Sequence, residues 1–116
     1  MYVYCTTRFE AFHAWPDAAT YDDEVAFLAD RHRHEFCVRL DVAVTHDDRD
    51  IEFILLKREL EAFIDAELVD PTTRDIDRSC EQIATEIATH FHNRFDAPVR
   101  VDVSEDGENG AIVTHD

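Results

Sequence analysis

The chain has 116 residues, of which 45% are apolar, and its formal net charge at pH 7 is −16. This length fits a single domain over residues 1–116, and the apolar share is enough for one modest core, which argues against a disordered chain. The charge argues against nucleic acid and anionic membrane surfaces as partners, because phosphate groups would be repelled. No apolar run approaches the roughly 20 residues that a membrane-spanning helix needs.

Lysine is nearly missing from the chain: Lys57 is the only one, and the other cations are arginines. The acidic residues are spread along the whole sequence and do not form a tail. A dispersed acidic surface suits a medium in which salt screens the repulsion between like charges. We therefore interpret the protein as halophilic; the alternative is an ordinary acidic protein.

The three cysteines, Cys5, Cys37 and Cys80, are widely spaced and odd in number. This pattern does not indicate a disulfide framework. The first five residues lack the basic region of a signal peptide. We therefore expect a reducing, cytoplasmic location.

Alternation of apolar and polar residues predicts four strands. They cover residues 2–13, 33–46, 99–104 and 111–113, with Gly107 and Gly110 bracketing a turn before the last one. The segment 14–31 is expected to be a long loop with one helical turn near Val25–Leu28.

The apolar period changes to helical spacing in the middle of the chain. It predicts an amphipathic helix over roughly 53–68 and a second helix from Ser79 to about Phe95. Ser79-Cys80-Glu81-Gln82 resembles a capping box at the start of the second helix. The order ββααββ predicts an α+β fold, in which two helices pack on one face of a four-stranded antiparallel sheet.

Three histidines are placed where two neighbouring strands meet. His13 closes the first predicted strand, while His32 and His34 open the second, so antiparallel pairing would bring the three together. The i, i+2 spacing puts the side chains of His32 and His34 on the same face of a strand. Three imidazoles with an open fourth position are typical of a catalytic zinc site. The alternative is three separate surface or core histidines.

Five motifs, in order along nearly the whole chain, resemble those of the 6-pyruvoyl- and 6-carboxytetrahydropterin synthase family. Phe9–His13 resembles its F-x-A-x-H, and His32–His34 resembles its H-G-H. Ile51–Lys57 is similar to the (I/V)-D-F-x-x-L-K of its first helix, and Ser79–Ala84 to the P-T-(S/T)-E-x-(L/V/A)-A of its second. Val101–Glu105 is similar to its last strand, where an E-T pair holds the pterin. The ββααββ order agrees with the tunnelling fold of that family.

The resemblance implies a metal site and a pterin site that lie together. The implied zinc ligands are His13, His32 and His34. Glu105 would bind the guanidine-like edge of the pterin through a bidentate contact, which suits a carboxylate. The groups at Ser79 and Cys80 would lie near the same ring.

The resemblance also implies a reaction and an assembly. The reaction acts on dihydroneopterin triphosphate, with zinc polarising side-chain oxygens while a base moves protons. It would serve deazaguanine tRNA modification (queuosine or archaeosine) or pterin biosynthesis, as a lyase. Members of the family form trimers stacked as hexamers, so a homo-oligomer is expected.

The proton-transfer residues of the family are not found where the resemblance would place them. The family's cysteine, four residues before H-G-H, corresponds to Leu28, and no cysteine lies between the two histidine motifs. The glycine of H-G-H is Arg33, which we expect to add bulk and charge near the metal. The family's D-H pair should fall near residues 68–70, where Asp70 is the acid and no histidine occurs.

Three interpretations of this gap stay open. A substitute base exists, with Asp70 as the catalytic candidate and Asp30 or Glu24 as further ones; or zinc serves a related pterin reaction; or the protein binds a pterin or purine-like ligand without turnover. Each of these acids can equally be a solvated loop carboxylate. Cys80, at a helix N-terminus, is either a reactive thiol with a lowered pKa or a replacement for the Ser or Thr of the family.

Overall fold

A computed structural model describes the whole chain, residues 1–116, and contains one four-stranded antiparallel sheet with helices. The strands lie in the order β1-β2-β3-β4, so β1 and β4 are the edges. This confirms the predicted α+β class and the four-stranded sheet. The elements are β1 (Tyr2–His13), α1 (Ala18–Tyr21), the 3₁₀ helix η1 (Asp23–Ala29), β2 (His32–Ala43), α2 (Phe53–Phe63), the π-helical turn η2 (Ile64–Leu68), α3 (Cys80–Phe95), β3 (Val99–Glu105) and β4 (Asn109–His115).

One face of the sheet carries the core. The register places Cys5 opposite Leu40, and Leu40 opposite Val101 on the next strand, and all three are buried. Because successive strand residues point to opposite faces, every second residue of these strands belongs to the same face. The alternating apolar positions read from the sequence are therefore the residues that the fold buries.

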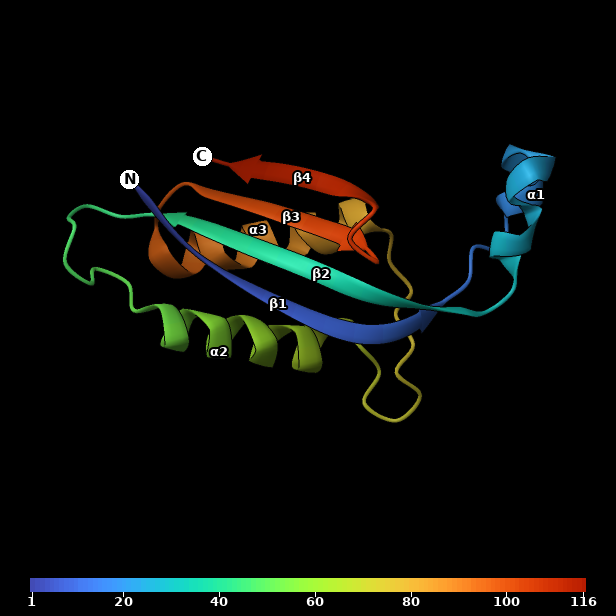
Figure 1. The fold of residues 1–116 in the computed structure, drawn as a ribbon, viewed down its shortest axis with the longest axis horizontal. Helices are drawn as coiled ribbons and strands as arrows, with labels where there is room; N and C mark the ends of the chain where they lie inside the picture. The colour runs from blue at the N-terminus through green and yellow to red at the C-terminus, as the bar shows by residue number, and fades with distance from the viewer.

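The two long helices supply the rest of the core. Their buried residues belong to the same apolar cluster as the buried strand residues. Helix α2 contacts β1, whereas α3 contacts β3 and β4 (Figure 1). The spacings of three and four residues between the buried positions are those of one helix face. These positions are Leu56 and Leu60 in α2, and Ile83, Ala84, Ile87, Ala88 and Phe91 in α3.

Local hydrogen bonds set the ends of the helices. The Ser79 hydroxyl accepts a hydrogen bond from the Gln82 N–H at 3.2 Å, and the Gln82 side chain accepts one from the Ser79 N–H at 3.0 Å. This confirms the capping box. At the end of the α2 region the Val69 N–H donates to the Ile64 carbonyl at 3.2 Å, five residues back. The last predicted turn of that helix is therefore a π-helical turn.

Three boundaries differ from those expected. The second strand ends at Ala43, before the predicted residue 46. The segment between β1 and β2 contains two short helices, α1 and η1, where one helical turn was expected. The last strand is longer than predicted and contains Gly110, which faces Ser104 of β3. A Cβ at Gly110 would lie 2.0 Å from the Val103 carbonyl oxygen, so this close approach of two strands needs glycine.

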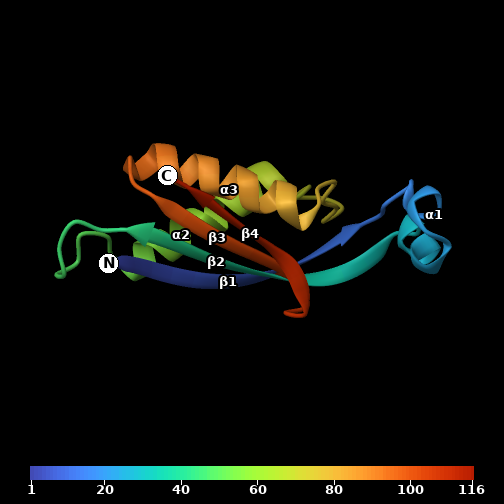
Figure 2. The same ribbon diagram turned by 90° about the horizontal axis from the view of Figure 1, so that it is seen from above.

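The molecule is elongated, with extents of 51 × 28 × 22 Å. The segment with α1 projects beyond one end of the sheet, and both termini lie at the opposite end (Figures 1 and 2). No helix combines the length and the apolar character that crossing a membrane requires. The end with α1 is also where the three histidines of the predicted metal site lie, since β1 ends and β2 begins there.

Candidate metal centre

Strand register brings the three predicted metal ligands together. His13 is the register partner of His32, and His34 is opposite Ala11, two residues earlier on β1. The three side chains therefore share one face of the sheet, as the spacing predicted. One potential ligand nitrogen from each imidazole lies within 4.8 Å of the others. The group could hold a metal ion.

The rings meet edge to face above an apolar floor. The ring centroids of His13 and His32 are 4.5 Å apart, those of His13 and His34 5.0 Å, and those of His32 and His34 4.8 Å, with interplanar angles of 70–88°. The buried Phe36 ring lies 5.7 Å from that of His13 and 5.9 Å from that of His34. This floor limits access to the imidazoles from the core side.

Hydrogen bonds orient two of the imidazoles. His32 Nδ1 lies 2.7 Å from the Asp30 carbonyl oxygen, and His34 Nδ1 lies 2.7 Å from Asp106 Oδ2. A carbonyl oxygen only accepts, so Nδ1 of His32 is the donor. Nε2 of both rings is buried and has no hydrogen-bond partner. Two unpartnered buried nitrogens with free lone pairs are what a metal ion would satisfy.

His13 is held in the neutral form that binds metal. Its pKa is lowered mainly by burial. Glu105 opposes this shift, the neighbouring His32 and His34 add to the lowering to a smaller extent, and a backbone hydrogen bond at Arg78 opposes it slightly. A histidine must be unprotonated to ligate a metal. At neutral pH the ring therefore needs no proton loss before a metal binds.

Glu105, one of the predicted ligand-binding residues, lies within ion-pair distance of two imidazoles. Its carboxylate oxygens are 3.6 Å from His13 Nε2 and 3.3 Å from His34 Nε2. These are ion-pair distances, but the second contact does not meet the geometry of a hydrogen bond, and His34 Nε2 counts as unpartnered. The contact is not a hydrogen bond, because the Nδ1–H tautomer leaves Nε2 of His34 without a proton to donate.

A hollow of about 900 Å³ opens beside these groups. Its wall brings two of the predicted metal ligands and the predicted ligand-binding residues together, with Leu28 on the side of the α1 segment, whereas His34 does not line it. Ser79 and Cys80 reach it from the start of α3, and Glu105 from the end of β3. The lining residues that the prediction named are His13, His32, Ser79, Cys80, Glu105 and Leu28.

Asp70, the predicted catalytic acid, is not among the residues that line this hollow. Its carboxylate accepts hydrogen bonds from the N–H groups of Thr72 and Thr73, at 2.8 and 2.9 Å. The same bonds, that of Thr73 first, hold its pKa below the usual value. The carboxylate thus closes its own turn, and the structure does not bring it to the histidines. The further candidates Asp30 and Glu24 also lie outside the lining.

One of the two alternatives for Cys80 is contradicted, and the expectation for Arg33 is wrong. Cys80 does not have a lowered pKa: burial, reinforced by Glu105 and Glu81, raises it to about 12. Burial disfavours the charged thiolate. Arg33 does not crowd the metal position. It lies on the opposite face of β2, as the residue between two same-face histidines must, and pairs with Glu10 at 2.7 Å.

Sequence reasoning missed Asp106, which follows Glu105 in the β3–β4 turn. Its carboxylate also accepts a hydrogen bond from the Glu35 N–H at 2.9 Å. That bond first, and the one with His34 next, hold its pKa below the usual value, so the carboxylate is ionised and His34 Nδ1 is the donor. The available signal was an acid directly after a predicted site residue, but the pairing with His34 spans 72 positions.

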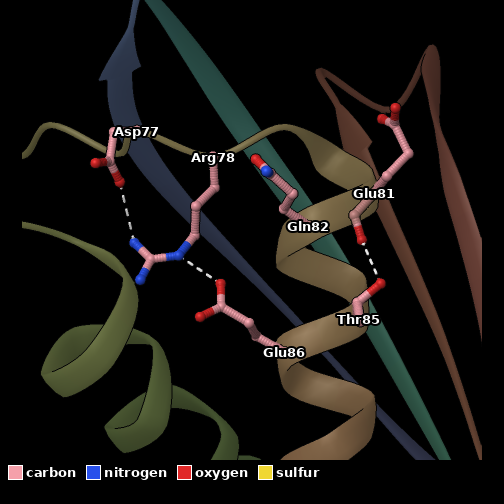
Figure 3. A pocket seen from close by; sticks show the side chains of 6 residues that line it. All are labelled: Asp77, Arg78, Glu81, Gln82, Thr85 and Glu86. Carbon is pink, nitrogen blue, oxygen red and sulfur yellow. Dashed lines mark hydrogen bonds and ion pairs between the residues drawn. The ribbon is translucent and has the colours of Figure 1, made fainter.

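Arg78 is the only Lys or Arg that lines the hollow. Its guanidinium pairs with Asp77 at 3.2 Å and with Glu86 on α3 (Figure 3). The Gln82 side chain on the first turn of α3 lies on the side of Arg78, while that of Glu81 points away from it (Figure 3). The one cation of the wall is thus already neutralised by two carboxylates.

No family model and no curated protein matches this chain.

Proposed function

We propose that the protein is a zinc-dependent pterin enzyme of the type that the motifs resemble, 6-pyruvoyl- or 6-carboxytetrahydropterin synthase. The observation that supports this most is the shared hollow: His13 and His32 of the three-imidazole group line it together with Glu105 and the start of α3, and His34 adjoins these two histidines. Zinc suits the donor set, because three neutral imidazoles with an open position form a catalytic zinc site. The two unpartnered Nε2 atoms fit that ion.

Each group of the site has a task in this proposal. His13, His32 and His34 hold the zinc, which supplies Lewis-acid polarisation of a substrate oxygen. Glu105 accepts two hydrogen bonds from the amino and ring N–H groups of the pterin. Ser79 and Cys80 offer short side chains at the start of α3, so a flat bicyclic ring has room there.

We further propose that the active form is a homo-oligomer, a trimer or a hexamer. Both edge strands, β1 and β4, have a free edge in the single chain. An unpaired edge is a template for pairing with another strand. Pairing between copies would join the sheets and bring further residues to the hollow at the end of β1.

A non-catalytic pterin- or purine-binding protein is the second candidate. The position of the expected cysteine is Leu28, Asp70 is turned into its own loop, and the Cys80 thiol has a raised pKa. No general base among the predicted ones therefore faces the metal position. Arg78, the one cation of the wall, is paired with Asp77 and Glu86, which disfavours a triphosphate.

The test is to incubate zinc-loaded protein in high salt with dihydroneopterin triphosphate and, separately, with dihydroneopterin, and to follow products by chromatography. Turnover of the triphosphate supports the enzyme. Saturable binding without turnover overturns the enzyme and supports the second candidate. Binding of neither compound contradicts both.

A matched pair of variants tests the role of Glu105. Hydrogen bonds to a charged group contribute about 1.5–3 kcal/mol, so Glu105→Gln should weaken pterin binding by roughly 10- to 100-fold. Glu108→Gln is the control, since Glu108 is exposed in the same turn and does not line the hollow. Equal pterin affinity in the two variants would remove Glu105 from the ligand site.

A further inference from the structure

His34 lies between two consecutive carboxylates that contact different sides of its ring. Glu105 faces Nε2 at 3.3 Å, on the side of the hollow, and Asp106 contacts Nδ1 at 2.7 Å, on the far side. Only the second contact is a hydrogen bond. The two acids therefore act on different nitrogens: one faces the site, and the other holds the ring from behind.

Asp106 is itself fixed by three interactions with β2. Its N–H donates to the Glu35 carbonyl at 2.7 Å, Oδ1 accepts from the Glu35 N–H at 2.9 Å, and Oδ2 accepts from His34. Its backbone has φ of 57°, a left-handed conformation that residues other than glycine rarely adopt.

His32 and His34 differ in the kind of group that orients them. The partner of His32 is the backbone carbonyl of Asp30, which any residue at position 30 retains. The partner of His34 is a side-chain carboxylate, which a substitution removes. A carboxylate behind a metal-binding histidine fixes its tautomer and raises the basicity of the ligating nitrogen.

We propose that Asp106 is the positioning residue of the metal centre, which holds His34 as the Nδ1–H tautomer and so leaves its Nε2 lone pair free for the metal. This inference rests on the zinc site of the proposed function and adds a specific residue to it. Asp106 does not contact the metal or the pterin; it acts through His34. The side chain of Asp30 has no such role.

The experiment compares zinc affinity in wild type, Asp106→Gly, Asp106→Asn and Asp30→Asn by competition with a chelator. Removal of such a partner typically weakens metal binding 10- to 100-fold, which is the loss expected for Asp106→Gly. Glycine accepts the left-handed backbone without strain, so the hairpin is retained. Asn offers one acceptor oxygen for two donors, and Asp106→Asn should give a smaller loss. Asp30→Asn removes the same charge nearby and should match wild type.

A second readout does not need zinc. Nitrogen-15 NMR of the histidine rings in zinc-free protein, at a pH where they are neutral, should show His34 as the Nδ1–H tautomer in wild type. The Asp106→Gly variant should lose this fixed tautomer, while His32 keeps its own. A merely structural role of Asp106 would lower the melting temperature without changing the tautomer.

The outcomes separate this inference from the proposed function. If wild type binds zinc and Asp106→Gly binds it equally well, the role of Asp106 is refuted and the zinc site stands. An equal loss of zinc affinity in Asp30→Asn and Asp106→Asn would mean that only the removed charge matters, and would also refute the role of Asp106. Wild-type protein that binds no zinc contradicts the proposed function itself.

Discussion

Two histidine groups lie at opposite ends of the fold, and only one is arranged for metal. At the α1 end the rings of His13, His32 and His34 meet edge to face, and their nitrogens converge. At the end with the termini, His92 and His115 stack face to face, with centroids 3.9 Å apart and an interplanar angle of 19°.

Proximity alone therefore does not make a metal site. Imidazole lone pairs lie in the ring plane, so stacked rings direct them along parallel lines and not toward one point. His92 Nδ1 is also engaged with the Ala97 carbonyl at 3.0 Å. His115 belongs to β4 and stacks on His92 there. Orientation by partner groups behind the ring distinguishes the two ends.

Removing one histidine from each end tests most directly which end binds the metal. His32→Ala should abolish stoichiometric zinc, because two imidazoles leave the ion without its third protein ligand. His92→Ala should keep the zinc content of wild type. Elemental analysis of protein passed through a desalting column measures both. Full zinc in His32→Ala, or loss in His92→Ala, would contradict the assignment of the metal to the α1 end.

The two buried cysteines, Cys80 and Cys5, should be equally unreactive, whereas the two histidine groups differ in their ability to bind metal. Burial raises the pKa of Cys80, beside the hollow, to about 12 and that of Cys5, in the core of the sheet, to about 11. For Cys80 the pKa rises from its ordinary value of 9.0. At pH 8 this rise lowers the fraction of the thiol present as thiolate about a thousandfold. Alkylation followed by peptide mapping should show both reacting slowly in folded protein and readily in denatured protein. Rapid modification of folded Cys80 would restore it as a nucleophile.

The helix start in the wall of the hollow should contribute to stability separately from the metal. Ser79→Ala removes the cap and should lower the free energy of unfolding by about 1 kcal/mol, with zinc binding kept. Thr85→Ala is a control on the same helix, since its hydroxyl only contacts the Glu81 carbonyl at 2.8 Å. Denaturant unfolding measures both. Loss of zinc in Ser79→Ala would mean that the cap and the metal centre are coupled.

Charge is the property that both ends share, so its effect should be general and gradual. With a net charge of −16, the folded chain repels itself at low ionic strength, and salt should raise its melting temperature. The rise of the melting temperature with salt should be the same for zinc-free His32→Ala and His92→Ala, whichever end carries the substitution. A maximum of stability at low salt would refute the halophilic interpretation.

Much of the fold followed from local patterns. Period-two alternation predicted β1 with its observed limits, and helical spacing with the Ser79–Gln82 capping box predicted α3. These features depend on neighbours within a few residues, which the sequence lists directly. The limits of β2 and β4, and the π-helical turn after α2, depend on how strands pair and helices pack, so local patterns missed them.

The candidate site divides in the same way. The sequence alone determined that His13, His32 and His34 share a strand face, because the side-chain period of a strand and antiparallel pairing are simple rules. Only the tertiary structure decided which acids meet them. Asp106 contacts His34 across 72 positions of the chain. Asp70, the predicted catalytic acid, is held by Thr72 and Thr73 in its own loop. The position of a carboxylate depends on the backbone conformation of its turn, and residue type alone does not give that conformation.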